Sequence, residues 1–304
     1  MTSDDLDEAD HVMRVAFGTY FNSPDPASTF GAAQYVRSRF AAGPEWSFVA
    51  ELDDEIVGSV FVTRWGSFGF FGPLTVRPDL WDGGIARQLM MPVVDSFDHW
   101  PVQLGGLFTF AQSTKHVNLY QSFGFWPRYL SAIMSKGVGT PARQEFELFS
   151  RVHTERRATT LDECAALTGE VFDGLDVRHE LTAVRDLALG DTLLLFDDDR
   201  LVALAVFHHG AGEAASGELY VKFAAVRPGA DASSHFDRLL GACERVAHER
   251  GAERVVAGVN TGRHLAYRQM MAAGFRSTTQ GVRMHRSNQE GFCRPHDFIL
   301  DDLR

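Results

Sequence analysis

The chain has 304 residues, which exceeds one average domain and suits two domains of about 150 residues, each able to bury a core. Hydrophobic residues make up 45% and charged residues 23%, ordinary globular values that exclude a disordered or fibrous protein. The 29 Lys and Arg residues against 40 Asp and Glu residues give a net charge of −11, which disfavours binding to nucleic acid or to an anionic membrane.

Cysteine usage and the start of the sequence indicate where the protein works. The three cysteines, Cys164, Cys243 and Cys293, are odd in number and far apart, which fits neither a disulfide framework nor a paired zinc site. The N-terminus is acidic without the features of a signal peptide, and no stretch reaches about 18 uninterrupted apolar residues. We therefore expect a cytoplasmic protein with no bound metal and no membrane contact.

The hydrophobic pattern of the first half predicts both helices and strands, from periods of about 3.6 and about 2 residues. Helices are expected over residues 6–21, 30–40, 84–100 and 116–123. Strands are expected over residues 46–51, 56–64, 68–76, 104–110 and 129–136. This order predicts the α/β class, specifically an α+β fold in which helices cover the faces of a mixed sheet.

Two sequence anchors occur twice in the chain at a constant distance. Val76-Arg77-Pro78 returns 150 residues later as Val226-Arg227-Pro228, and Gly124-Phe125 returns at the same offset as Gly274-Phe275. An ordered repeat of separate anchors indicates that a whole domain has been duplicated.

The duplication predicts two domains joined by a linker. Residues 137–154 begin with several glycines and a proline and have little periodicity, which is typical of a linker. We therefore expect a first domain over residues 1–136 and a second over residues 155–304, including a C-terminal tail. The tail residues 298–300 could add a strand, dock on the second domain or stay disordered.

The most informative segment, residues 74–89, is a strand that leads through a glycine-rich turn into a helix. Such a turn exposes unpaired backbone N–H groups at a helix N-terminus, where the helix dipole also favours an anion. Gly83 and Gly84 would let a phosphate approach the backbone because no Cβ stands in the way. The pattern is that of a pyrophosphate-binding turn, although a plain connection between strand and helix would look similar.

This segment resembles the cofactor motif of the GNAT superfamily of acyl-CoA N-acyltransferases, V-x-P-x-x-[QR]-x-x-G-x-[GA]. Val76, Pro78, Gly84 and Ala86 match the motif at the right spacing. Trp81 stands where the family usually has Gln or Arg, so a side-chain contact to phosphate is missing while the backbone turn is kept.

A second family signature follows in the right order. The superfamily has a Leu-Tyr pair, three residues and then Gly-Phe, and this chain has Leu119-Tyr120 followed by Gly124-Phe125. An Asn that is common seven residues before the Tyr is replaced by Ser113, which could keep one hydrogen bond to the cofactor or none.

The resemblance implies two tandem GNAT-like acyltransferase domains and acetyl-CoA as the cofactor, with transfer of its acyl group to the primary amine of a small molecule by direct attack on the thioester. It implies a splayed pair of strands over residues 71–76 and 104–110, with the Val76 N–H as oxyanion donor and Tyr120 as the acid that protonates the departing thiolate. The cofactor-binding residues that it implies are Leu74, Thr75, Val76, Trp81, Asp82, Gly83, Gly84, Ile85, Ala86, Arg87, Ser113 and Tyr120.

The sequence names neither the general base nor the acceptor. Many relatives carry a Glu or Asp on the strand before V-x-P, but residues 70–74 contain no carboxylate, and Glu51 reads as a surface residue. Aromatic residues that could face an apolar or cationic acceptor, or simply be core, lie on the first helix and nearby strands. They are Phe17, Tyr20, Phe21, Trp65, Phe68, Phe70 and Phe71.

The second copy has lost the features of the cofactor site. Ser234 and Phe236 stand where the motif requires Gly and then Gly or Ala, and Met270 stands where the catalytic Tyr would be. In tandem members of the superfamily one half commonly keeps the chemistry while the other is degenerate. We therefore expect a structural or acceptor-shaping role for the second half.

Two other functions stay open. One is a non-enzymatic acyl-CoA-binding or sensor protein, which the missing base and Trp81 favour. The other is a tRNA-dependent aminoacyl transferase, which the net charge of −11 and the lack of a basic stripe disfavour. The acyl chain length and a homo-oligomeric state are not encoded in any pattern that we find.

Overall fold

A computed structural model describes all residues 1–304, which form eight α-helices and one twelve-stranded sheet. The helices are α1 Leu6–Tyr20, α2 Tyr35–Ala42, α3 Ile85–His99, α4 Thr114–Gln121, α5 Thr154–Val171, α6 Arg178–Asp186, α7 Ala232–Glu249 and α8 His264–Ala272. The strands are β1 Ser47–Leu52, β2 Glu55–Trp65, β3 Phe68–Val76, β4 Leu104–Thr109, β5 Phe125–Gly137, β6 Glu147–Leu148, β7 Gly190–Asp197, β8 Arg200–His209, β9 Glu218–Val226, β10 Arg254–Asn260, β11 Arg276–Arg286 and β12 Ile299–Leu300. Below, α1 to β5 are the N-terminal half and β6 to β12 the C-terminal half.

The predicted elements of the first half are confirmed in kind and order, and two of them start well away from the predicted residue. The second helix starts at Tyr35 rather than Phe30, because Phe30 and Gly31 take positive φ angles of 70° and 53°, which a right-handed helix does not allow. The last strand starts at Phe125 rather than Tyr129, because its pairing with β11 continues as far as Phe125 and Arg286.

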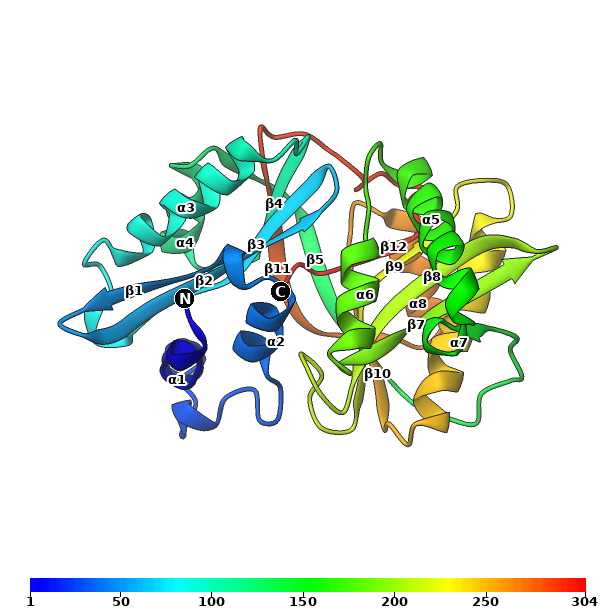
Figure 1. Ribbon diagram of the computed structural model, residues 1–304, viewed down its shortest axis with the longest axis horizontal. Helices are drawn as coiled ribbons and strands as arrows, with labels where there is room; N and C mark the ends of the chain where they lie inside the picture. Colours follow the sequence, from blue (N-terminus) through cyan, green and yellow to red (C-terminus); the bar gives the residue numbers. More distant parts are fainter.

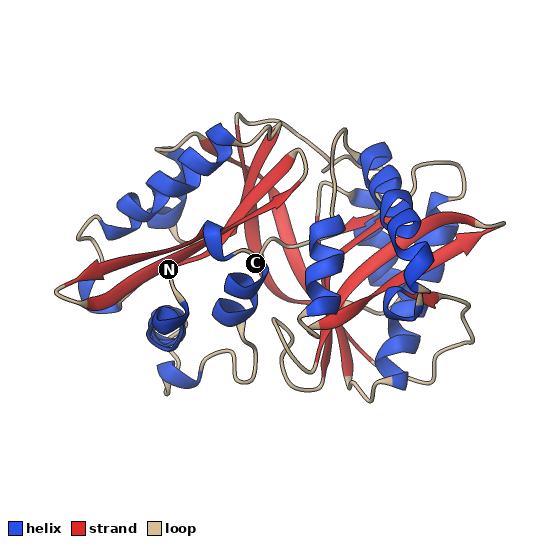
Figure 2. Cartoon of the chain, in the orientation of Figure 1, coloured by secondary structure: helices blue, strands red, loops and turns tan.

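Alternating side chains place helices on both faces of the N-terminal sheet (Figures 1 and 2). On β2, Val60 and Val62 share a buried cluster with α3, whereas Ile56 and Phe61 pack with α1 and α2 on the opposite face. Successive strand residues point to opposite faces, so one apolar strand serves both layers. The mixed α/β class predicted from the sequence is confirmed.

The two halves exchange their last strands. The sheet runs in the order β1-β2-β3-β4-β11-β5-β10-β9-β8-β7-β6, so β11 lies between β4 and β5, and β5 pairs with β10. The C-terminal strand β11 thereby supplies Val282 and Met284 to the core of the N-terminal half. Each half is completed by a strand from the other, which no local sequence pattern indicates.

The segment between the halves and the tail are both partly ordered by strand pairing. Residues 138–146 carry no helix or strand, and β6 then pairs with β7. In the tail, β12 pairs with β9 through Ile299 and Ala225 and through Leu300 and Ala224, so the tail adds a strand. No helix combines the length and the apolar character needed to cross a membrane.

The strand exchange predicts that a residue of the C-terminal half stabilises the N-terminal core. Met284 is fully buried in the cluster that contains Val60 and Leu107, so Met284→Ala should lower the free energy of unfolding by about 2–5 kcal/mol. Urea denaturation followed by tryptophan fluorescence measures this, with Met91→Ala on the exposed side of α3 as the control. Equal unfolding midpoints for the two variants would contradict the exchange.

Candidate functional site

The parallel strands β3 and β4 pair over only three positions and then separate. The pairs are Phe68 with Leu104, Gly69 with Gly105 and Phe70 with Gly106. Beyond them β3 carries one more residue than its other neighbour β2, because Phe71 pairs with Val62 while Leu74 pairs with Val60. Such a bulge bends the strand and ends its pairing. The gap between residues 71–76 and 107–109 lies where the sequence predicts a splay.

Backbone groups of β3 point into this splay. The Arg77 N–H donates to the Val57 carbonyl at 2.8 Å, across the antiparallel pair of β2 and β3. Hydrogen-bonding direction alternates along an antiparallel strand, so the N–H and C=O groups of Val76 and Leu74 point away from β2. Thr75 faces β2 instead, and its hydroxyl lies 3.1 Å from that of Ser59.

The turn before α3 offers several unpaired N–H groups beside the splay. Gly84 occupies the helix N-cap with φ of 85°, a left-handed conformation that glycine adopts without strain, and a Cβ there would meet no atom within 4 Å. The first backbone bond of the helix runs from the Arg87 N–H to the Gly84 carbonyl at 3.0 Å. The N–H groups of Gly84, Ile85 and Ala86 find no acceptor in the chain. This arrangement fits a phosphate.

Tyr120 projects from α4 into the core below the splay. Its ring packs against Phe71 with a centroid distance of 5.6 Å, and only 7% of the residue is exposed. Burial raises the pKa of the phenol well above its ordinary value, so the group stays protonated across the physiological range. The hydroxyl makes no hydrogen bond within the protein, which leaves it free to donate to a ligand.

Ser113 precedes α4 and lies at the mouth of the splay, with no side-chain bond to the helix N-terminus. It lies beside Tyr20 of α1, whose ring stacks on Phe110 at 5.2 Å. His116 lies 5.8 Å from the same ring, and burial together with Lys115 lowers its pKa. The sequence analysis missed both His116 and Lys115, which lie within the second signature but not at the positions that were compared.

Most of the aromatic residues considered for an acceptor site belong to the core. Trp65, Phe68 and Phe70 pack in one buried cluster and Phe71 in another, whereas Tyr20 and Phe21 remain partly exposed at the mouth of the splay. Glu51 is exposed on β1 and makes no hydrogen bond through its side chain. Neither β3 itself nor Glu51 therefore provides a carboxylate that could act as the general base on this strand.

Comparison with known proteins identifies the N-terminal half. Residues 12–125, which contain the splay, the glycine turn and α4, match the model of the acetyltransferase (GNAT) family. Residues 12–125 therefore form a GNAT-family domain. No curated protein matches the chain, so the family model is the sequence evidence for this assignment.

Solved structures extend the GNAT fold to the C-terminal half. A proposed acetyltransferase from Pyrococcus horikoshii is 15% identical with a TM-score of 0.68, over 98% of this chain and 91% of its own. A GCN5-related N-acetyltransferase from Sphaerobacter thermophilus is 15% identical with a TM-score of 0.58, over 96% and 94%. A tandem GNAT protein from the clavulanic acid biosynthesis pathway is 13% identical with a TM-score of 0.58, over 93% and 95%. At these identities the likeness concerns the fold.

The second GNAT-like half has an equivalent splay, but the tail fills it. The strands β9 and β10 pair from Glu218 to Val221 and then separate, and β12 lies along β9 in the gap. The Val226 N–H, equivalent to that of Val76, donates to the Phe298 carbonyl at 3.0 Å. Met270, at the position equivalent to Tyr120, is fully buried and apolar. The structure thus leaves one of the two splays open.

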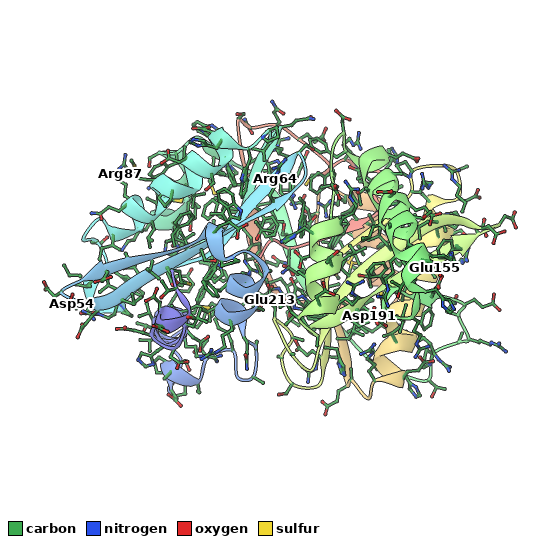
Figure 3. All side chains as sticks on the ribbon, in the orientation of Figure 1. Asp54, Arg64, Arg87, Glu155, Asp191 and Glu213 are labelled. Atoms are coloured by element: carbon green, nitrogen blue, oxygen red, sulfur yellow. The ribbon has the colours of Figure 1, made fainter.

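Buried charges join the two GNAT-like halves behind β3. Arg39 of α2 donates to the Gly72 carbonyl and makes two bonds of 2.9 Å to Glu213, which lies centrally between the halves (Figure 3). Lys222 lies 2.9 Å from Glu213 and 3.0 Å from Glu180. Despite desolvation, Arg39 and Lys222 hold the pKa of Glu213 far below its usual range. The pairs anchor the bulge of β3 to the C-terminal half.

His208 makes this junction sensitive to acid. Its Nδ1 accepts the Glu213 N–H at 3.0 Å, while burial and Lys222 lower its pKa to about 4. Below an ordinary pKa of about 6.5 the unfolded chain binds a proton that the folded chain does not, so stability falls as the pH falls toward 4.

Replacing His208 should reduce this acid sensitivity. When the pH falls from 7 to 5, the free energy of unfolding of His208→Gln should decrease by about 1–2 kcal/mol less than that of the unmodified chain. Urea unfolding at both pH values measures this, and equal losses would contradict it.

Proposed function

We propose that this GNAT protein is an acetyl-CoA-dependent N-acetyltransferase that acylates the primary amine of a small molecule, with its chemistry in the N-terminal half. The observation that carries the proposal is the contrast between the two splays. The N-terminal one keeps the Val76 N–H free beside unpaired N–H groups at the Gly84 turn. The C-terminal one has its equivalent N–H paired with the tail. A single acyl-CoA site per chain follows.

The residues around the open splay fit the chemistry of direct transfer. Bound acetyl-CoA would supply the acetyl thioester. The N–H groups that β3 turns into the splay, including that of Val76, are suited to hold the thioester carbonyl, and such donors stabilise a transition state by about 2.7–4 kcal/mol. Tyr120 would donate its proton to the departing sulfur, since the phenol is protonated and has no partner in the protein.

The acceptor would reach the thioester from the face opposite α3 and α4. Those helices cover one face of the splay, while on the other face Leu303 of the tail lies against Gly106 and α2 lies beside Gly72. Both halves therefore contribute to the acceptor side. The amine partner belongs to this proposal because the family resemblance implies it. A cytoplasmic location and the absence of nucleic acid and membrane partners also belong to it, on the basis of the charge and cysteine pattern.

An acyl-CoA sensor without catalysis is the second candidate. The lack of a carboxylate on β3 favours it, because no side chain there can remove the proton that an ammonium group must lose before its nitrogen attacks the thioester. Both candidates require the acyl-CoA site. Binding of acetyl-CoA without acetyl transfer to any amine would select the sensor.

The first experiment is a calorimetric titration with acetyl-CoA. We expect one molecule bound per chain, and we expect Gly84→Glu to abolish binding, because it places bulk and negative charge at the turn and forces a left-handed conformation on a non-glycine residue. Gly210→Glu, a positive-φ glycine with open space in the C-terminal half, is the control for folding and backbone strain. Two molecules per chain would mean that the tail leaves the second splay, and none would refute the proposal.

The catalytic step is tested by Tyr120→Phe on a panel of primary amines, with release of CoA thiol as the readout. The variant keeps the ring packed on Phe71 and removes only the acid, so kcat should fall by about 10²-fold or more while acetyl-CoA still binds. Tyr129→Phe, an exposed tyrosine on β5, should leave kcat unchanged. Unaltered turnover in Tyr120→Phe would remove this residue from the mechanism.

A further inference from the structure

Trp81, the residue that departs from the family motif, reaches back to the splay. Its indole N–H donates to the Val76 carbonyl at 2.8 Å, although the ring itself is 37% exposed. This carbonyl points into the splay, as the alternation along β3 requires. The side chain that replaces Gln or Arg therefore occupies a backbone acceptor that a ligand lying along β3 would need.

The C-terminal half shows how a ligand can use the equivalent positions. There β12 lies along β9 as an added strand, paired with Ala224 and Ala225, and the carbonyl of Phe298, directly before β12, accepts the Val226 N–H. An extended ligand with amide groups would pair with β3 in the same manner, through N–H and C=O groups of alternating residues. Such pairing at Val76 requires the Trp81 indole to turn away.

Lys115 connects the opposite side of the splay to the same turn. It lies in the first turn of α4, and its Nζ is 2.7 Å from the Asp82 carboxylate and 5.8 Å from the centre of the Trp81 ring. The lysine and aspartate side chains are 53% and 80% exposed, so this ion pair is easily exchanged for another partner. Trp81, Asp82 and Lys115 thus bridge the glycine turn and α4 across the entrance.

The side-chain charges at the turn oppose the pyrophosphate that its backbone N–H groups suit. Asp82 places a carboxylate directly before Gly83 and Gly84, where an anionic ligand would lie. Arg87 points outward from α3 (Figure 3), where it donates to Ser122 at 3.1 Å and lies over Phe123. Lys115 is the cation that the structure holds against the turn, and Asp82 neutralises it.

We propose that Trp81, Asp82 and Lys115 form a latch between the glycine turn and α4, and that Lys115 exchanges Asp82 for the pyrophosphate of acetyl-CoA when the cofactor binds. Lys115 then supplies, from α4, the cationic contact that the motif loses at Trp81. The exchange turns Asp82 toward solvent and frees the Val76 carbonyl for an amide of the cofactor arm. This inference rests on the proposed acetyl-CoA site and assigns it a binding residue outside the family motif.

Two probes separate the phosphate contact from the rest of the site. Acetyl-CoA carries the pyrophosphate, whereas acetyl-pantetheine carries the same thioester and amides without it. Lys115→Ala should weaken acetyl-CoA binding about tenfold and leave acetyl-pantetheine binding unchanged. Asp82→Asn should strengthen acetyl-CoA binding, and Trp81→Phe, which removes the N–H and keeps a ring, should strengthen binding of both probes.

Controls and outcomes keep the test specific. Lys136→Ala is the matched lysine, because Lys136 forms a 2.6 Å ion pair with Glu244 in the C-terminal half. Raising the salt concentration should weaken acetyl-CoA binding less in Lys115→Ala than in the unmodified chain. Equal affinity of the Lys115→Ala and unmodified chains for acetyl-CoA, or equal weakening of both probes, would overturn the latch and leave the cofactor site in place. Failure of the unmodified chain to bind either probe would instead overturn the proposed function.

Discussion

Two parallel strands that stop pairing leave backbone groups without partners, and both halves of this protein are arranged around that constraint. Buried N–H and C=O groups must bond to something. In the C-terminal half the need is met internally, because β12 pairs with β9 and the Val226 N–H finds the Phe298 carbonyl. In the N-terminal half the Trp81 indole meets part of it and the Val76 N–H stays free. The open splay is therefore the site at which a ligand can act as the missing strand.

The half without an open splay is still needed for the one that has it. β11 fills the place beside β4 and brings Met284 into the N-terminal core. Glu213 holds Arg39, which in turn bonds to the Gly72 carbonyl at the bulge where β3 leaves β4. The strands that form the splay are thus fixed from both sides by residues that lie far away in the sequence. The geometry of the open splay therefore depends on contacts from the C-terminal half.

The sequence was sufficient to predict those features of the fold that depend on residues close together in the chain. The V-x-P segment, the glycine at the N-terminus of α3 and the helix that carries Tyr120 all lie where their spacing placed them. The strand exchange was out of reach, because β11 pairs with β4 and β5 pairs with β10 across long stretches of sequence, and no pattern within either strand identifies its partner. The position of Lys115 against Asp82 was equally hidden, since it arises from how α4 meets the turn in space.

The tail also accounts for the difference between the two V-x-P segments. A strand tethered to its own chain competes at a high effective concentration, so a free ligand would rarely displace β12. With β12 in the gap, no glycine turn precedes the helix, and α7 starts at Ala232, closer to its V-x-P than α3 does. Ser234 then lies within a helix rather than at its cap, and Phe236 is free to pack in the core. Filling the splay and losing the anion-binding turn are two parts of one structural change, which leaves the chain with a single candidate site.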